Sequence, residues 1–136
     1  MSGVPEFDSL KFHAAALKLR SHRQQILTSN LANADTPGYK ARDIDFASAL
    51  RAELGAGSSA SRLNVARTRP GHQMARGESE GPEVLYRASQ QPSLDGNTVD
   101  PDVERAQFGE NAVMTDAALT FLNSAIRSRL SAITGQ

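Results

Sequence analysis

The chain has 136 residues, 5% of them aromatic and none of them tryptophan, so it fits one modest domain with few large side chains for a core. Fifteen basic residues balance fifteen acidic ones, which argues against a net field that would attract nucleic acid or an anionic membrane. The absence of cysteine excludes disulfides, thiolate nucleophiles and cysteine-ligated zinc.

Residues 1–35 are predicted to form a long N-terminal helix. Asp8 or Ser9 can cap its start, and Pro37 stops it because a proline disfavours helical geometry in the residue before it. Apolar residues recur at seven-residue spacing in two neighbouring rows, which predicts one narrow stripe on an amphipathic helix. The rows are Leu10, Leu17 and Leu31, with Gln24 in the missing position, and Phe12, Leu19 and Ile26.

Residues 36–54 are predicted to form a turn and an extended loop. Thr36-Pro37-Gly38-Tyr39 suits a type II turn, because proline presets the second position and glycine accepts the positive φ of the third. Just before it, Asn30 and Asn33 share one helix face. We expect their amides to bind backbone groups at the helix end or to bond across to another segment.

Residues 55–99 read as a flexible middle. The stretch GAGSSAS from Gly55 to Ser61 has a linker composition. Two strand-like runs follow, Leu63–Val65 and Val84–Tyr86, and Asp95-Gly96-Asn97 is typical of a tight turn of the kind that joins hairpin strands. A small irregular or β-containing segment, with room for a short β-hairpin, is therefore predicted.

Residues 100–136 are predicted to form a second long helix. Asp100 is a good N-cap, and Pro101 suits the first helical position. Apolar residues follow at spacings of three, four and seven: Leu119, Leu122, Ile126, Leu130 and Ile133. We expect a mostly α fold in one structural unit, whose end helices pair as a coiled-coil-like hairpin and bury one stripe against the other. Such a pair is poor in core and suited to packing between chains.

Candidate chemistry is weak. His13 and His22 lie nine residues apart on the first helix and face different sides, and Asp95, Asn97 and Asp100 lack the rest of a calcium loop. Asp43 and Asp45 offer a carboxylate pair with no evident basic partner, so we expect solvated side chains rather than the site of a small hydrolase. The sequence predicts no enzyme, no metal and no cofactor.

Membrane and nucleic-acid signals are also weak. No apolar run approaches the ~20 residues of a membrane span, and the N-terminus lacks the charged start and apolar stretch of a secretory signal. The basic window from Arg62 to Arg76 has no interleaved aromatic residues of a nucleic-acid surface. We expect no direct membrane span, no nucleic-acid partner and no cleavable signal peptide.

Several motifs together carry a resemblance. Asn30–Asn33 followed by Thr36–Lys40 resembles the N-terminal signature of the bacterial flagellar axial proteins, which comprise rod, hook and hook-associated subunits. The continuation Ala41–Phe46, the run from Asp95 to Phe108 and the later Leu119–Asn123 are similar to the small proximal rod subunits among them. The likeness covers roughly two thirds of the chain.

This resemblance implies a structural subunit of the flagellar basal body that leaves the cytoplasm unfolded through the type III export apparatus. It implies helical assembly into the proximal rod, at the inner-membrane base in the periplasm, as part of the drive shaft and export channel. Its implied partners are other rod proteins, copies of itself, a FliE-type adaptor, the export gate and the membrane ring.

The residues expected at subunit interfaces come from both stripes and the turn between the predicted segments. They are Leu10, Leu17, Leu19, Ile26, Asn30, Leu31, Asn33, Pro37, Gly38, Tyr39, Phe46, Leu119, Leu122, Ile126, Leu130 and Ile133. An alternative interpretation of the same helices is a small adaptor that grips one partner helix.

Overall fold

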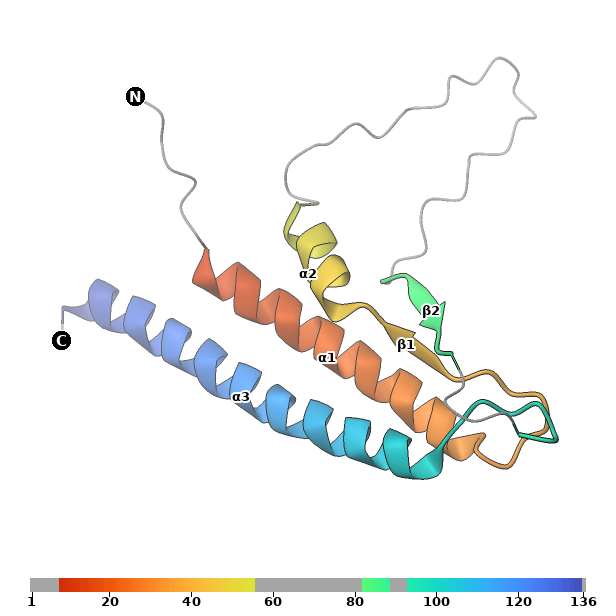
Figure 1. Cartoon of the computed structure of the whole chain (residues 1–136). Coiled ribbons are helices and arrows are strands. Elements are labelled where there is room, and N and C mark those ends of the chain that lie inside the picture. Colours follow the sequence, from red (N-terminus) through yellow and green to blue (C-terminus); the bar gives the residue numbers. More distant parts are fainter. Residues whose placement is uncertain (1–7, 56–81, 89–92, 136) are drawn as a thin grey trace, which may run out of the picture.

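Two long antiparallel helices dominate the molecule, and a third helix and a two-stranded sheet lie along one side of them (Figure 1). The computed structural model describes residues 8–55, 82–88 and 93–135. In chain order the elements are α1 (Ser9–Ala32), β1 (Arg42–Ile44), α2 (Phe46–Gly55), β2 (Val84–Tyr86) and α3 (Pro101–Thr134). The predicted mostly α fold, with paired end helices and a small β element, is confirmed.

The ends of α1 and α3 follow from local capping chemistry. The Asp8 carboxylate accepts from the backbone N–H groups of the first turn of α1, and the Asp100 carboxylate does the same for α3, where Pro101 takes the first position. Gly135 ends α3 in the left-handed region with φ 72°. The predicted N-caps of both helices, and the predicted place of Pro101, are confirmed.

The turn after α1 has the predicted form. Gly38 has φ 71°, and the Tyr39 N–H donates to the Thr36 carbonyl over 3.3 Å. The chain then runs extended only as far as Asp45, so the expectation of an extended loop to residue 54 is corrected. Asp45 accepts from the N–H groups of Ala47 and Ser48 and thereby starts helix α2.

The strands β1 and β2 pair antiparallel, with Arg42 opposite Tyr86, Asp43 opposite Leu85 and Ile44 opposite Val84. Val84–Tyr86 is thus a strand, as its composition indicates. Its partner strand is β1, in the segment that follows the turn after α1. Ile44 of β1 lies opposite Val84, which is 40 residues later in the sequence. The other strand-like run, Leu63–Val65, lies outside the described residues.

The buried apolar core is small and belongs mainly to α1, with contributions from β1 and α3. It consists of Ala15, Ala16, Leu19, Ile26, Leu27, Ala41, Ile44 and Ala118. On α3 the buried residues are Glu104, Asn111 and Ala118, seven apart, and Asn111 Nδ2 donates to the Arg20 carbonyl of α1 over 3.0 Å. The fully buried positions of α3 are therefore polar or small.

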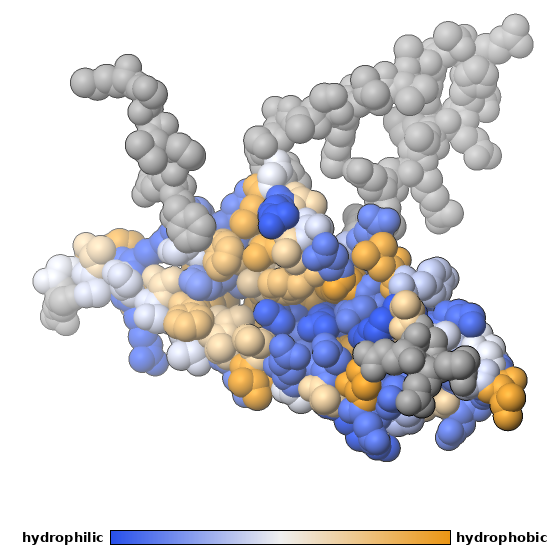
Figure 2. All heavy atoms as spheres, in the orientation of Figure 1, coloured by the Kyte–Doolittle hydropathy of each residue, from blue (hydrophilic) through white to orange (hydrophobic). Residues whose placement is uncertain are grey.

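This arrangement corrects the expected pairing of apolar stripes within the chain. Leu119, Ile126, Leu130 and Ile133 are between 41% and 83% exposed, and Leu122 is half-buried. Figure 2 shows apolar residues gathered over α2 and the neighbouring helices, with polar residues gathered towards the turn end.

None of the described helices is both long and apolar enough to cross a membrane.

Candidate functional site

Two motifs that are far apart in the sequence meet at one end of the helix pair. The Gly38 N–H donates to the Asp95 carbonyl over 2.9 Å, and the Thr98 N–H donates to the Tyr39 carbonyl over 3.0 Å. The Thr98 hydroxyl accepts from the Ala41 N–H over 2.8 Å. The loop after α1 and the loop before α3 thus form one junction.

Asn97 ties this junction to the end of α1. Its side chain is buried, and Nδ2 lies 3.1, 2.7 and 3.0 Å from the carbonyl oxygens of Asn33, Ala34 and Thr36. Helix ends leave several carbonyls without an intrahelical partner. Asn97 supplies donors for that region, while its Oδ1 accepts from the Val99 N–H.

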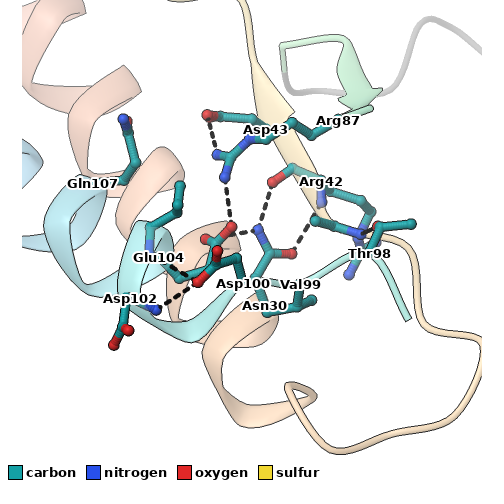
Figure 3. Close-up of polar contacts among 12 residues, drawn as sticks. Asn30, Arg42, Asp43, Arg87, Thr98, Val99, Asp100, Asp102, Glu104 and Gln107 are labelled. Carbon is teal, nitrogen blue, oxygen red and sulfur yellow. Dashed lines mark hydrogen bonds and ion pairs between the residues drawn. The ribbon is translucent and has the colours of Figure 1, made fainter. Parts of the chain in front are cut away.

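Asn30 lies at the centre of the junction and is fully buried (Figure 3). Its Oδ1 accepts from the Arg42 N–H over 3.0 Å, and its Nδ2 donates to the Arg42 carbonyl over 2.6 Å and to Glu104 Oε2 over 3.2 Å. The prediction that this amide bonds across to another segment is confirmed. Asn33 takes the local option and donates to the Ser29 carbonyl over 2.8 Å.

A chain of alternating charges joins four segments beside Asn30. Arg23 Nε of α1 lies 2.9 Å from Asp43 Oδ1 of β1. Arg87, directly after β2, bonds to Asp43 Oδ2 over 2.7 Å and to Glu104 Oε1 of α3 over 2.5 Å. Glu104 is 1% exposed, so this carboxylate is stabilised only because a cation and Asn30 bond to it.

The electrostatics keep Asp43 ionised. Burial raises the pKa of Asp43, but hydrogen bonds from Arg23 and Arg87 outweigh burial and hold the pKa below its ordinary value. The bond to Asp43 in turn raises the pKa of Arg23. A carboxylate so held has no proton to give and is a poor base, so its task in this arrangement is structural.

The expectation of two solvated carboxylates is therefore wrong for Asp43, and Asp45 serves separately as the cap of α2. Sequence reasoning missed Arg23, Arg87 and the burial of Glu104. Asp43 and Glu104 both lie in motifs that carry the family resemblance, but no local pattern identifies their basic partners.

Metal chemistry receives no support within residues 8–55, 82–88 and 93–135, where no group of three or more His, Asp or Glu side chains is placed to hold an ion. Asp95 Oδ1 instead accepts from the Asn97 N–H over 3.1 Å, and Asp100 caps α3. His13 stacks on Phe121, with ring centroids 5.8 Å apart.

The residues expected at subunit interfaces divide by burial, and their role there stays a prediction. Buried within the chain are Leu19, Ile26 and Asn30. Half-buried are Leu10, Leu17, Leu31, Asn33, Tyr39, Phe46 and Leu122. Exposed are Pro37, Gly38, Leu119, Ile126, Leu130 and Ile133. Only the exposed and half-buried side chains are accessible to another chain in this conformation.

Comparison with known proteins identifies the family. Residues 10–40 match the family described as "Flagella basal body rod protein". The chain is 44% identical to the flagellar basal body rod protein FlgB of Salmonella typhimurium, over 93% of this chain and 94% of that protein. It is also 44% identical to FlgB of Escherichia coli K12, over 92% of each chain, and 45% identical to FlgB of Cereibacter sphaeroides, over 95% and 96%. With the motifs of the junction inside these matches, the chain belongs to the FlgB family of flagellar basal body rod proteins.

Proposed function

We propose that this structural rod subunit assembles helically through its end helices, with copies of itself and with other rod proteins, and so helps to form the drive shaft and export channel of the proximal rod. One observation carries the proposal. Leu119, Ile126 and Ile133 recur seven residues apart on α3 and are 41%, 47% and 83% exposed. A large apolar row left uncovered on a helix is typical of an interaction surface.

The lengths of the helices support the same conclusion. The 34 residues of α3 span about 51 Å and the 24 residues of α1 about 36 Å, at ~1.5 Å per residue. Arg129 bonds to Asp8 over 2.5 Å and thereby ties α3 to the start of α1. Leu130 and Ile133 follow this point, where Figure 1 shows α3 running past the beginning of α1.

Assembly would supply the missing burial. Each Å² of apolar surface removed from water contributes about 25 cal/mol, and that gain offsets the entropy lost when a loose helix end becomes ordered. A contact between different faces of neighbouring copies continues as a helical array when it does not close into a ring. The interface we propose uses the exposed α3 row together with the accessible residues of the turn, Pro37, Gly38 and Tyr39.

The proposed neighbours are other rod proteins, a FliE-type adaptor, the export gate and the membrane ring. The proposed location is the periplasm at the inner-membrane base, reached through type III export. Support for both comes from the family membership and from the sequence features that resemble the proximal rod.

Hydrogen exchange of the purified chain tests this proposal. We expect the amides of α3 after Ala118 to exchange fast in dilute protein and to become protected in isolated basal bodies, while amides near Asn30 are protected in both. Circular dichroism of the dilute chain should accordingly show less helix than the full length of α3 requires. A fully helical chain that melts cooperatively and protects both helix ends would contradict the proposal and favour a two-helix adaptor.

A further inference from the structure

The small sheet has one closed edge and one open edge. Along two antiparallel strands, pairs of opposite residues alternate between two kinds. In one kind the two residues hydrogen-bond to each other, and in the next their backbone N–H and C=O groups point away from the partner strand, towards the outer edges of the pair. The Arg87 N–H donates to the Ala41 carbonyl over 2.8 Å, so Arg42 and Tyr86 form a pair whose backbone groups point outward. The outward groups of Arg42 are both bonded to Asn30, which closes the β1 edge as a third strand would.

Among the described residues, none covers the β2 edge in this way. By the same alternation, the outward N–H and C=O groups on this side belong to Val84 and Tyr86, and no described residue bonds to them. The side chains are also accessible: Val84 is 38% exposed, Leu85 46% and Tyr86 76%. An edge strand with free backbone groups and apolar side chains is a template for pairing with another strand.

We propose that β2 of a second copy of this chain occupies the open edge, antiparallel and related by a two-fold axis at Leu85. This register places Val84 opposite Tyr86 of the other copy, so the outward backbone groups of these two residues meet and exchange four hydrogen bonds across the axis. Leu85 lies opposite its own counterpart on the axis. The result is a four-stranded sheet in the order β1-β2-β2-β1.

The charges flanking β2 fit this register. Glu83 and Arg87 lie two residues on either side of Leu85, so each Glu83 falls opposite Arg87 of the other copy. Glu83 is exposed and makes no ion pair with any described residue. Arg87 bonds to Asp43 and Glu104 but keeps 24% of its side chain exposed. A strand pairing with itself in this register therefore gains two opposite-charge pairs.

This dimer goes beyond the proposed rod assembly and does not depend on it. A contact that places the same patch on both chains is closed by its two-fold axis and cannot propagate along a rod. We therefore assign it to free subunits, in which it covers an edge that would otherwise invite aggregation.

Single-cysteine crosslinking of the purified full chain tests the register, because the natural sequence contains no cysteine. Across the axis the two copies of residue 85 form a pair without mutual hydrogen bonds, whose Cα atoms are about 4.5 Å apart, within disulfide range. We expect oxidised Leu85→Cys protein to form a disulfide dimer at a yield about tenfold above that of Tyr86→Cys, whose two copies are offset by two residues.

Two further variants complete the design. An equimolar mixture of Val84→Cys and Tyr86→Cys chains should crosslink as the heterodimer more than either chain crosslinks with itself. Adding Glu83→Lys to Leu85→Cys should lower the dimer yield severalfold by setting lysine opposite Arg87, and adding Glu83→Gln should lower it less. Leu94→Cys, on a fully exposed turn, measures random collision. A Leu85→Cys yield no higher than that of Leu94→Cys would overturn the proposal and indicate that something other than a second copy covers β2.

Discussion

Asn30 connects three segments through one carboxamide. It bonds to both backbone groups of Arg42, accepts from the Tyr39 hydroxyl over 3.3 Å and donates to Glu104. Because the residue is fully buried, each of these bonds replaces one that water would otherwise make. An amide is the side chain that can both donate and accept here, which explains an asparagine at this position.

Replacing Asn30 with Asp should therefore destabilise the chain. The change removes the donor for Arg42 and sets a second carboxylate about as close to Glu104 as the amide is now, 3.2 Å. We expect a loss of about 3 kcal/mol in the free energy of unfolding, measured by urea titration. The same exchange at Asn123, an exposed residue of α3, is the control and should change stability little. Equal effects at the two positions would contradict this account of Asn30.

Asp43 gives the molecule a defined dependence on pH. Its folded pKa is held below the ordinary value, so its ion pairs stabilise the fold at pH values above about 3.9, the pKa of an unfolded Asp. That stabilisation disappears as the pH falls through the folded pKa. Near neutral pH, Asp43→Asn should cost about 2 kcal/mol, less than for a fully buried pair because the side chain is 20% exposed.

Thermal unfolding across pH measures this effect. The difference in Tm between the natural chain and Asp43→Asn should be largest near neutral pH and shrink as the pH falls below about 4. Asp35→Asn, an exposed carboxylate in the turn after α1, is the matched control. A Tm difference that stays constant down to strongly acidic pH would show that the loss has another origin.

At the scale of elements, the features that could be predicted are those set by neighbours in sequence. Asp100 before Pro101 predicts the start of α3, and the sequence Thr36–Tyr39 predicts the turn after α1. Both predictions succeed because caps and turns depend on a few adjacent residues. The pairing of β1 with β2 and the bonds of Arg87 could not be predicted. The strand pairs and the Arg87–Asp43 bond join residues 40 to 44 positions apart, and the Arg87–Glu104 bond joins residues 17 positions apart. Any of the fifteen basic residues could have neutralised Asp43.

The seam between α1 and α3 shows the same limit. Leucine and isoleucine spacing correctly indicates which residues share a face, but not which face meets α1. The buried row on α3 is Glu104, Asn111 and Ala118, and its polar members can be buried only because other segments bond to them. Glu104 bonds to Asn30 and Arg87. Asn111 bonds to the Arg20 carbonyl and to Gln24. An apolar row indicates burial somewhere, and here the described part of the chain does not provide it.

Two glycines should respond in opposite ways to the same change. Gly38 has φ 71° and Gly109 is helical, and at both positions an added Cβ would meet no atom within 4 Å. Backbone conformation alone therefore decides. Gly38→Ala should lower stability by about 1–2 kcal/mol, whereas Gly109→Ala should raise it by about 0.5–1 kcal/mol. Thermal unfolding of both variants measures this, and a stabilising Gly38→Ala would mean that the turn is not of type II.

At the scale of the whole molecule, the exposed row of α3 separates folding from assembly. Leu130 is 58% exposed, so Leu130→Asp should change the stability of the free chain by no more than about 0.5 kcal/mol. In an assembled rod the new charge would be desolvated against a neighbour. We expect export of the variant to continue while rod assembly and swimming are lost in a strain that carries only this copy.

Ser128→Asp is the matched control, because Ser128 is exposed in the same part of α3. This substitution adds the same charge without removing an apolar side chain. The readouts are swimming in soft agar, secretion of the variant, and its presence in isolated basal bodies. Normal swimming with Leu130→Asp would remove Leu130 from the proposed interface.

The bonds between Asn30 and Arg42 close the intervening segment into a ring of fixed length. Adding or deleting one residue there would move Arg42 away from the amide and shift the strand against Tyr86. The described contacts of the junction all lie before Gly55 or after Pro82 in the sequence. An epitope or fluorescent label inserted between these two residues should leave every described bond of the junction in place, which makes this stretch the natural point at which to tag the subunit.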